Sequence, residues 1–397
     1  MKQLNIYIFI VLIVQCGCIN NKFENHTERI EMSHTPTLIR LNDSFQIINI
    51  KKAKNIDTDK FLSMIKTINY MQLDSKEYIG EITKMEVTNK HIVIMDSFVA
   101  EKLFVFDRKG KLLFLISGKG KGPEEYLSLW DFYIDTFKNE IVVNDALARV
   151  RMYYSMHDGS FIKREKSVAN CYMTRIDNHY VNLLTHQQDF NVEDDFSILI
   201  TEKDSVLYKG FALAPIQRNN YIVNSFMSDY DGEILYTPLN SDTTYRLNSD
   251  FTYSPKYVIN QKKSIWNKRN NDLSESEISN LIKENHYTRY SGDFRSTENT
   301  AIFNIQHPFK QFIISSAHIW DKRNHAVYKW NITQPSVMKD VVVAPAATFE
   351  NIYFGHFPAF GNDFLQSHES TLNPQLREIL KAADKNSNPI VVMYELF

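Results

Sequence analysis

The chain has 397 residues, of which 43% are hydrophobic and 23% charged, as in folded globular proteins, so a disordered or collagen-like chain is excluded. Its 45 Lys and Arg against 47 Asp and Glu give a net charge of −2, so there is no positive excess to bind nucleic acid. The 21 Tyr and 26 Phe favour a β-rich fold, and the 3 Cys are too few for a disulfide scaffold.

The N-terminus has the pattern of an export signal. Lys2 precedes the apolar run Ile6–Val14, which is shorter than the roughly 20 residues of a membrane-spanning helix. Gly17 before Cys18 resembles a bacterial lipobox, so we expect a lipoprotein signal peptide at 1–17 and lipidation of Cys18, with an uncleaved anchor as the alternative. Residues 18–37 are mostly polar and are expected to form a flexible linker, which leaves the lipid as the only membrane contact.

A repeat follows the linker. Ile92–Asp96 and Ile141–Asp145 begin two segments that align without a gap at an offset of 49 residues. Side-chain class is retained at the aligned positions, which are Asp96 with Asp145, Lys102 with Arg151, Phe104 with Tyr153 and Gly110 with Gly159. Each unit contains four short strands joined by turns, which predicts the four-stranded blade of a β-propeller. The two Asp residues are interpreted as turn residues, with a cation site as the alternative.

The rest of the chain accommodates six such units. We therefore predict an all-β fold, a six-bladed β-propeller over 38–397 whose ring is closed by N- and C-terminal strands. The sixth blade is expected to combine 340–343 and 389–394 with strands near 45–50 and 68–73, which removes free sheet edges. Two short helical insertions are also expected, one after the capping box of Ser274 and Glu277 and one after Asn373-Pro374.

The most specific motif is the loop from Gly118 to Tyr126. Its defining residues are Gly118, Gly120, Gly122, Pro123, Glu125 and Tyr126. Closely spaced glycines can cradle a phosphate, but no Gly-Lys-Ser/Thr begins a helix here, and the two carboxylates would repel an anion. We interpret the motif as a structural loop between blades, in which the glycines adopt unusual φ angles, Pro123 fixes a turn and Tyr126 fills the seam.

This motif, its flanks and the C-terminal run Asn388–Tyr394 resemble the six-bladed β-propeller lipoproteins of Gram-negative bacteria, which are similar to NHL-repeat propellers and largely lack an assigned activity. The family usually has Gly at the position of Glu124. The resemblance implies a propeller anchored in the cell envelope as an outer-membrane lipoprotein, and it implies no catalytic set. In some relatives acidic residues after the lipidated Cys accompany surface display. Ile19–Glu24 lacks such a run, which favours the periplasmic face.

The sequence carries no motif of catalysis or metal binding. It lacks His-Glu-x-x-His and Gly-x-Ser-x-Gly, and we expect no catalytic residue, metal ligand or cofactor. Two functions remain. One is a binding or scaffold module for a glycan, peptide or protein partner, which we expect to be a monomer, and the other is a hydrolase or lyase acting on glycans or other envelope polymers. We favour binding, because propellers present a broad face of loops. Trp130, Tyr153 and Tyr154 are candidate ligand contacts, with blade core as the alternative.

Overall fold

The computed structural model describes residues 32, 34–167, 172–184, 196–203, 205–212, 227–228, 232–238, 241–266, 273–309, 312–333, 335–359, 362–384 and 386–397. The expected signal peptide 1–17 and Cys18 lie outside these residues, as does most of the expected linker. The linker residues that are described contact the third blade. The side-chain ammonium of Lys209 donates to the carbonyl oxygen of Met32 (2.7 Å), and Thr37 forms a parallel β-bridge with Lys209.

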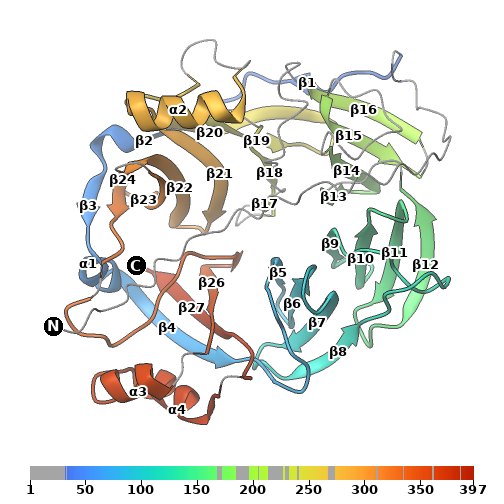
Figure 1. Cartoon of the computed structure of the whole chain (residues 1–397). Helices are drawn as coiled ribbons and strands as arrows, with labels where there is room; N and C mark the ends of the chain where they lie inside the picture. Colours follow the sequence, from blue (N-terminus) through green and yellow to red (C-terminus); the bar gives the residue numbers. More distant parts are fainter. Residues whose placement is uncertain are drawn as a thin grey trace.

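Six sheets stand around a central axis, and neighbouring strands within each are antiparallel apart from three N-terminal additions (Figure 1). Blade 1 contains, from the axis outward, β5 (Lys84–Val87), β6 (His91–Asp96), β7 (Lys102–Asp107) and β8 (Leu112–Ile116). Blade 2 contains β9 (Asp131–Asp135), β10 (Glu140–Asp145), β11 (Val150–Ser155) and β12 (Phe161–Lys166). Blade 3 contains β13 (Tyr172–Ile176), β14 (His179–Leu183), β15 (Phe196–Glu202) and β16 (Ser205–Ala212).

The second half of the ring repeats this arrangement. Blade 4 contains β17 (Met227–Ser228), β18 (Ile234–Tyr236), β19 (Thr243–Leu247) and β20 (Thr252–Asn260). Blade 5 contains β21 (Arg289–Ser296), β22 (Thr300–Phe309), β23 (Phe312–Asp321) and β24 (Ala326–Trp330). Blade 6 contains β25 (Ala347–Phe349), β26 (Ile352–Phe357), β27 (Ile390–Leu396) and, outermost, β4 (Ile65–Gln72). The six-bladed all-β fold is therefore confirmed, as is its closure by strands from both chain ends.

The position of a strand in its blade explains its composition. Each blade is sandwiched between two others, so the middle strands are apolar on both faces, and residues 92–96 of β6 are all buried. The outermost strand of blade 2 has no further strand beside it. There, β12 exposes Lys163 and Arg164, and such charges discourage pairing with another chain.

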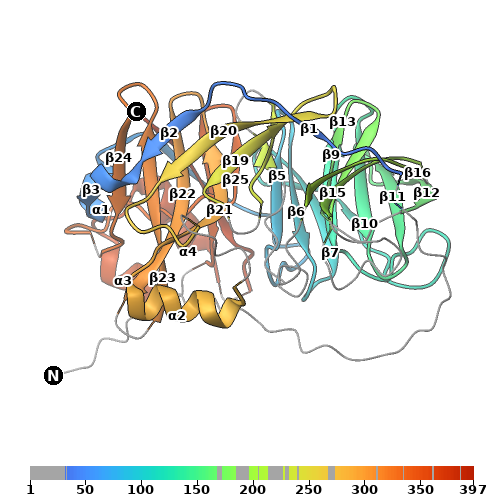
Figure 2. The same cartoon turned by 90° about the horizontal axis from the view of Figure 1, so that it is seen from above.

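The N-terminal residues 37–72, here called the N-terminal belt, run along the outside of blades 3 to 6. β1 (Ile39–Arg40) and β2 (Gln46–Asn49) pair in parallel with β20, and after a 3-10 turn at Ile50–Lys52 β3 (Lys54–Ile56) pairs in parallel with β24. Figures 1 and 2 show these blue strands on the outer rim of the ring. The expected place of 45–50 in the sixth blade is therefore wrong, because β2 extends blade 4 instead.

The sixth blade differs from the expectation at a second place. Residues 340–343 form no strand, and the inner strands of this blade are β25 and β26. Val343 instead packs against Gly355 of β26, where an added Cβ would lie 2.5 Å from a Val343 methyl group. A short run of valines has the same pattern whether it pairs in a sheet or packs across one, so periodicity could not separate the two.

The repeat also has a shift that a gapless alignment misses. The hairpin loop between β6 and β7 has five residues, and the one between β10 and β11 has four, so β7 corresponds to β11 at an offset of 48. Arg151 therefore occupies the place of Leu103, and Tyr153 that of Val105. The alignments of Lys102 with Arg151 and of Phe104 with Tyr153 are wrong, because a shift of one residue reverses the face of every side chain.

The described residues include four helices at the outside of the ring: α1 (Thr58–Leu62), α2 (Glu275–Asn285), α3 (Asn362–His368) and α4 (Pro374–Ala382). The two expected insertions are α2, whose capping box of Ser274 and Glu277 is present, and α4, which Asn373 caps. Neither α1 nor α3 was expected from the sequence pattern. None of the helices in the described part of the chain has the length and apolar content to cross a bilayer.

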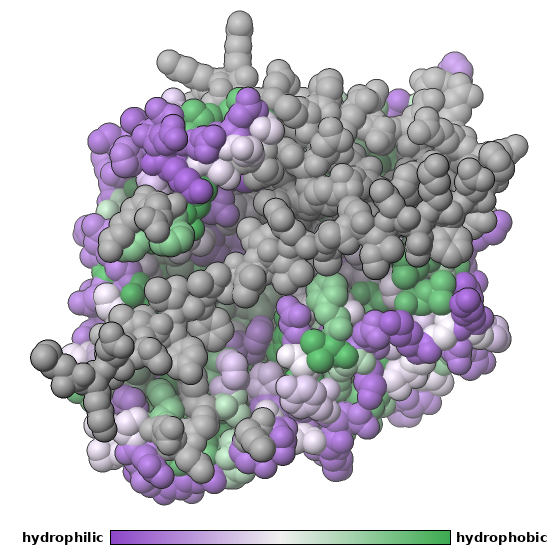
Figure 3. Space-filling model, viewed as in Figure 1, coloured by the Kyte–Doolittle hydropathy of each residue, from purple (hydrophilic) through white to green (hydrophobic). Residues whose placement is uncertain are grey.

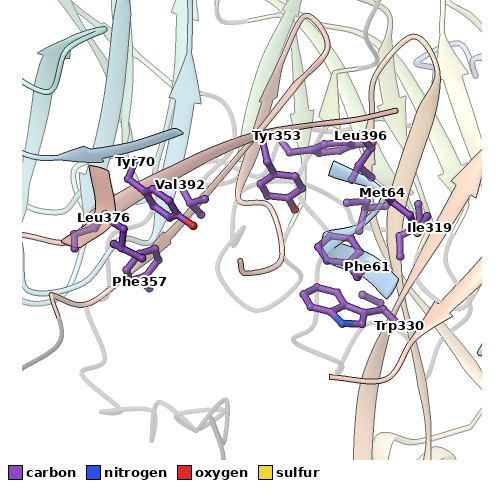
Figure 4. Close-up of a cluster of buried hydrophobic side chains, with 14 of the residues drawn as sticks. Phe61, Met64, Tyr70, Ile319, Trp330, Tyr353, Phe357, Leu376, Val392 and Leu396 are labelled. Atoms are coloured by element: carbon purple, nitrogen blue, oxygen red, sulfur yellow. The ribbon is translucent and has the colours of Figure 1, made fainter. Parts of the chain in front are cut away.

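A buried cluster joins blades 5 and 6 to the belt. Phe61 of α1 stacks on Trp330 of β24, with ring centroids 4.1 Å apart, and meets Tyr394 of β27 edge to face at 6.1 Å (Figure 4). Aromatic pairs of this kind contribute about 0.5–1.5 kcal/mol beyond their buried area. The cluster thus fixes the belt at the point where the ring closes.

Candidate functional site: the central cavity

A cavity of about 1640 Å³ lies on the propeller axis, lined mainly by innermost strands. These strands run in the same direction along the axis, so residues before them and residues after them lie at opposite mouths. Glu81 and Trp130 precede β5 and β9, whereas Phe137 and Asp177 follow β9 and β13, and all four line the cavity. The cavity therefore extends from one face of the ring to the other.

Lys84 connects three blades across the cavity wall. Its ammonium lies 2.8 Å from Asp131 of blade 2 and 2.9 Å from Glu86 of its own strand. The second carboxylate oxygen of Asp131 accepts a hydrogen bond from the backbone N–H of Met173 in blade 3 (2.8 Å). Burial alone would lower the pKa of Lys84, but the negative charges of Asp131 and Glu86 outweigh it and raise that pKa, so the ammonium stays charged.

A second ion pair lies toward the other mouth. Arg175 of β13 pairs with Asp135 of β9, and its guanidinium also donates to Asn178 (3.0 Å). Asp135 in turn accepts from the backbone N–H of Lys138 (3.0 Å). Both pairs therefore join innermost strands of neighbouring blades, and their cations are already neutralised within the protein.

Trp130 and Tyr172 form an aromatic wall beside the first mouth. Their ring centroids are 6.4 Å apart, and both side chains are half-buried and line the cavity. The indole N–H of Trp130 has no hydrogen-bond partner among the described residues. That N–H is buried, so it is the ring of Trp130, together with Tyr172, that contributes to the cavity wall.

The other two candidate contacts do not reach the cavity. Tyr153 is 1% exposed and Tyr154 is 4% exposed, and because they are neighbours on β11 they point to opposite faces of blade 2. The Tyr153 hydroxyl donates to Glu165 (2.6 Å) and contacts the hydroxyl of Tyr180 in blade 3. Both tyrosines are inter-blade core, so Trp130 alone of the three faces the cavity.

The family model named Domain of unknown function (DUF4934) matches residues 45–395, which span the whole ring. The chain belongs to the DUF4934 family. None of the curated proteins matches it. Among solved structures, a protein of Bacteroides fragilis described as exported is 16% identical, with a TM-score of 0.72 over 89% of this chain and 100% of that one.

Two further structures show weaker similarity to this DUF4934 chain. A member of the duf4221 family from Bacteroides vulgatus is 10% identical, with a TM-score of 0.47 over 84% of this chain and 97% of that one. Virginiamycin B lyase of Staphylococcus aureus is 10% identical, with a TM-score of 0.38 over 83% of this chain and 100% of that one. The match with the B. fragilis protein supports the fold alone, because so low an identity carries no information on the site.

The glycine loop of this DUF4934 propeller lies between blades 1 and 2. Tyr126 is 1% exposed, and its hydroxyl donates to the carbonyl oxygen of Glu101 (2.6 Å), so it fills the seam. The expectation of unusual φ angles is wrong, because Gly118, Gly120 and Gly122 are absent from the described glycines with positive φ. Gly120 instead provides room, since an added Cβ would lie 1.9 Å from the carboxylate of Glu125.

That carboxylate closes the loop. Glu125 accepts a hydrogen bond from the backbone N–H of Gly122 (2.8 Å), and its own N–H donates to the Gly122 carbonyl (3.2 Å), in a turn that contains Pro123. The loop amide of Gly122 is thus occupied by a carboxylate of the same loop. This arrangement agrees with a structural loop between blades.

The two repeat aspartates cap turns in this DUF4934 fold. Asp96 and Asp145 are fully buried. Asp96 accepts from the backbone N–H groups of Gly80 (2.8 Å) and Glu81 (2.9 Å), and further from two in its own loop. Among the described residues, no group of three His, Cys, Asp or Glu is placed to hold a metal ion.

Sequence reasoning missed Lys84, Asp131, Asp135 and Arg175 as cavity residues. A signal was present in β9, where Asp131 and Asp135 are four residues apart in an otherwise apolar strand and therefore share a face. Their partners come from neighbouring blades, which no local pattern reveals. His356 also lines the cavity, and burial lowers its pKa, so its imidazole is neutral at pH 7.

Proposed function

We propose that this DUF4934 protein is a binding or scaffold propeller that holds part of a glycan, peptide or protein partner in its central cavity. The observation that carries the proposal is the cavity of about 1640 Å³ with the aromatic pair Trp130 and Tyr172 on its wall. Cavities for drug-sized ligands measure about 300–1,000 Å³, so this one has room for an extended ligand. The paired cations of the cavity wall support binding over proton transfer, because their charges are tied into inter-blade contacts.

We further propose that the protein is a lipoprotein of the outer membrane, anchored through Cys18 and facing the periplasm. The support is the sequence pattern of Lys2, the apolar run Ile6–Val14 and Gly17 before Cys18. A Cys18→Ala variant is expected to leave the membrane fraction. If it partitions with membranes as the parent does, the anchor assignment is wrong.

The binding proposal is tested on the chain from residue 19 to 397 with panels of soluble peptides and oligosaccharides. A ligand is expected to bind the parent and to lose at least tenfold in affinity with Trp130→Ala, because alanine removes the aromatic ring from the cavity wall. Trp266→Ala is the matched control. Trp266 is also half-buried with an unpartnered indole N–H, but it packs beside α2, outside the cavity.

The two tryptophan variants separate the outcomes. If Trp130→Ala and Trp266→Ala lose the same affinity for the ligand, or if neither loses any, the cavity is not the binding site. Release of a cleaved product from a bound glycan or envelope polymer would instead identify the protein as a hydrolase or lyase. Isothermal titration calorimetry measures the affinities, and mass spectrometry of the ligand after incubation detects cleavage.

A further inference from the structure

The cavity carries more negative charge than the whole chain. Its lining includes seven Asp and Glu residues but only three Lys and Arg, a net charge of −4, whereas the complete sequence has a net charge of −2. The acids are Glu81, Glu86, Asp131, Asp135, Asp177, Asp293 and Glu350, and the bases are Lys84, Arg175 and Arg295. The rest of the molecule is therefore slightly positive, and the negative charge is concentrated on the axis.

All three bases already have acidic partners. Lys84 pairs with Asp131 and Glu86, Arg175 pairs with Asp135, and Arg295 lies 3.7 Å from Asp293. Within the described part of the chain, Glu81 and Asp177 form no ion pair. Glu350 interacts electrostatically with Arg108, but Arg108 does not line the cavity. The negative charges of Glu81, Asp177 and Glu350 are therefore not neutralised by any base that lines the cavity.

These acids lie at both ends of the cavity. Glu81 precedes β5 at one mouth, and Asp177 follows β13 at the other, where Glu350 lies in the turn after β25. A narrow cavity with walls of low dielectric constant focuses the field of such charges along its axis and raises the local concentration of cations. The field therefore acts on a ligand at either mouth and along its length.

The first mouth suits the apolar stem of a basic side chain. Trp130 and Tyr172 lie together on the wall there, and Phe98, which also lines the cavity at this mouth, is 67% exposed. Figure 3 shows hydrophobic side chains in green among hydrophilic ones in purple over blades 1 and 2 on this face. Aromatic rings attract ammonium and guanidinium groups, and they also pack against the apolar stems of Lys and Arg side chains.

We propose that the ligand of the cavity is a positively charged polypeptide segment, in which Lys or Arg side chains meet the cavity carboxylates and pack on the aromatic pair Trp130 and Tyr172. This inference rests on the proposed binding function and deepens it. A neutral glycan would use the aromatic wall but would leave the concentrated carboxylate charge unused. An acidic peptide would be repelled at both mouths.

The test uses the chain from residue 19 to 397 and four labelled probes of similar length. The probes are octapeptides of alternating Lys-Gly, Glu-Gly and Ser-Gly, and a hexamer of N-acetylglucosamine. Fluorescence anisotropy is measured at 50 mM and 300 mM salt. The Lys-Gly peptide is expected to bind best, and its affinity is expected to fall with salt, because the screening length shortens as ionic strength rises.

A charge-removing variant locates the effect. Glu81→Gln with Asp177→Asn removes one carboxylate charge at each mouth, and Asn is tolerated at the positive φ of residue 177. Its affinity for the Lys-Gly peptide is expected to fall about fivefold, from two partly exposed charge pairs. The control, Glu202→Gln with Glu284→Gln, removes the same charge from exposed positions outside the cavity and should bind as the parent does.

The possible results distinguish the two proposals. If the N-acetylglucosamine hexamer or the Ser-Gly peptide binds as well as the Lys-Gly peptide and Trp130→Ala abolishes this binding, the charge inference is overturned while the binding function stands. Tighter binding of the Glu-Gly peptide, or equal affinities in the cavity and control variants, also overturns the inference. If no probe shows binding that depends on Trp130, both proposals are contradicted.

Discussion

Replacement of Asp145 gives the sharpest test of the repeat's structural logic. The carboxylate is fully buried and accepts four hydrogen bonds. The donors are the backbone N–H groups of Leu127 (2.6 Å), Ser128 (3.1 Å) and Ala148 (3.0 Å) and the hydroxyl of Ser128 (3.0 Å). It thereby connects the strand end of β10 to the segment entering β9 and to its own hairpin loop.

The magnitude follows from these donors. Asp145→Ala leaves three backbone N–H groups without partners in a largely buried place, at about 1–3 kcal/mol each, and we expect a loss near the lower end, about 4 kcal/mol in all. Asp145→Asn keeps one carbonyl oxygen and should lose about 2 kcal/mol, because its amide group faces the N–H of Leu127. Asp158→Ala is the control, because Asp158 caps an exposed turn where water replaces it.

Urea denaturation followed by tryptophan fluorescence measures these losses as shifts in the midpoint at constant slope. From most to least stable, the order should be parent, Asp158→Ala, Asp145→Asn and Asp145→Ala. Calcium should not change the stability of any of them. The turn-capping explanation fails if Asp145→Ala is as stable as Asp158→Ala. It also fails if calcium raises the unfolding midpoint of the parent but not that of Asp145→Ala.

Three further predictions concern single side chains. Burial lowers the pKa of His318 to about 4, so between pH 6.5 and 4 this imidazole binds a proton in the unfolded chain but not in the folded chain. The free energy of unfolding should therefore fall by about 3 kcal/mol as pH drops from about 6.5 to 4. Thermal unfolding at pH 7 and pH 4.5 measures this loss, which should be smaller in His318→Phe than in the parent. An equal loss in both proteins would contradict the prediction. Burial raises the pKa of Asp242 to about 6, against hydrogen bonds that lower it, so its contribution is present below about pH 4 and is lost as pH rises through 6. Asp242→Asn should therefore gain up to about 3 kcal/mol at pH 7.5 but almost nothing at pH 4 in the same assay. Gly120→Ala should destabilise the parent by about 1 kcal/mol but should cost little when it is made in the Glu125→Ala variant, whereas a φ requirement would make the cost equal in both backgrounds.

The sequence predicts the blades well where its pattern is local. The offset of 49 residues identified blades 1 and 2, and the capping box at Ser274 located the start of α2. These features depend on neighbouring residues, and periodicity records them directly. The gapless alignment failed only at β11, where a loop shortened by one residue moved Arg151 and Tyr153 to the other face.

The cavity was harder to predict because its contacts are distant in sequence. Lys84 and Asp131 lie 47 residues apart and meet only when two blades stand side by side. Trp130 was singled out as an aromatic residue, but nothing in its neighbourhood distinguished it from Tyr153, which is core. A buried acid in an apolar strand, such as Asp131, was the one local sign that an inward face carries charge.

The N-terminal belt has a consequence for the order in which the chain can fold. Its strands are synthesised first, yet β1 and β2 pair with β20 and β3 pairs with β24, which are made some 200 to 270 residues later. β4 completes its sheet with β27, which ends one residue before the C-terminus. Such distant pairings form slowly, because long loops must close first. The N-terminal belt therefore remains without its partner strands until β20, β24 and β27 have been made, and loss of β27 would leave the ring open.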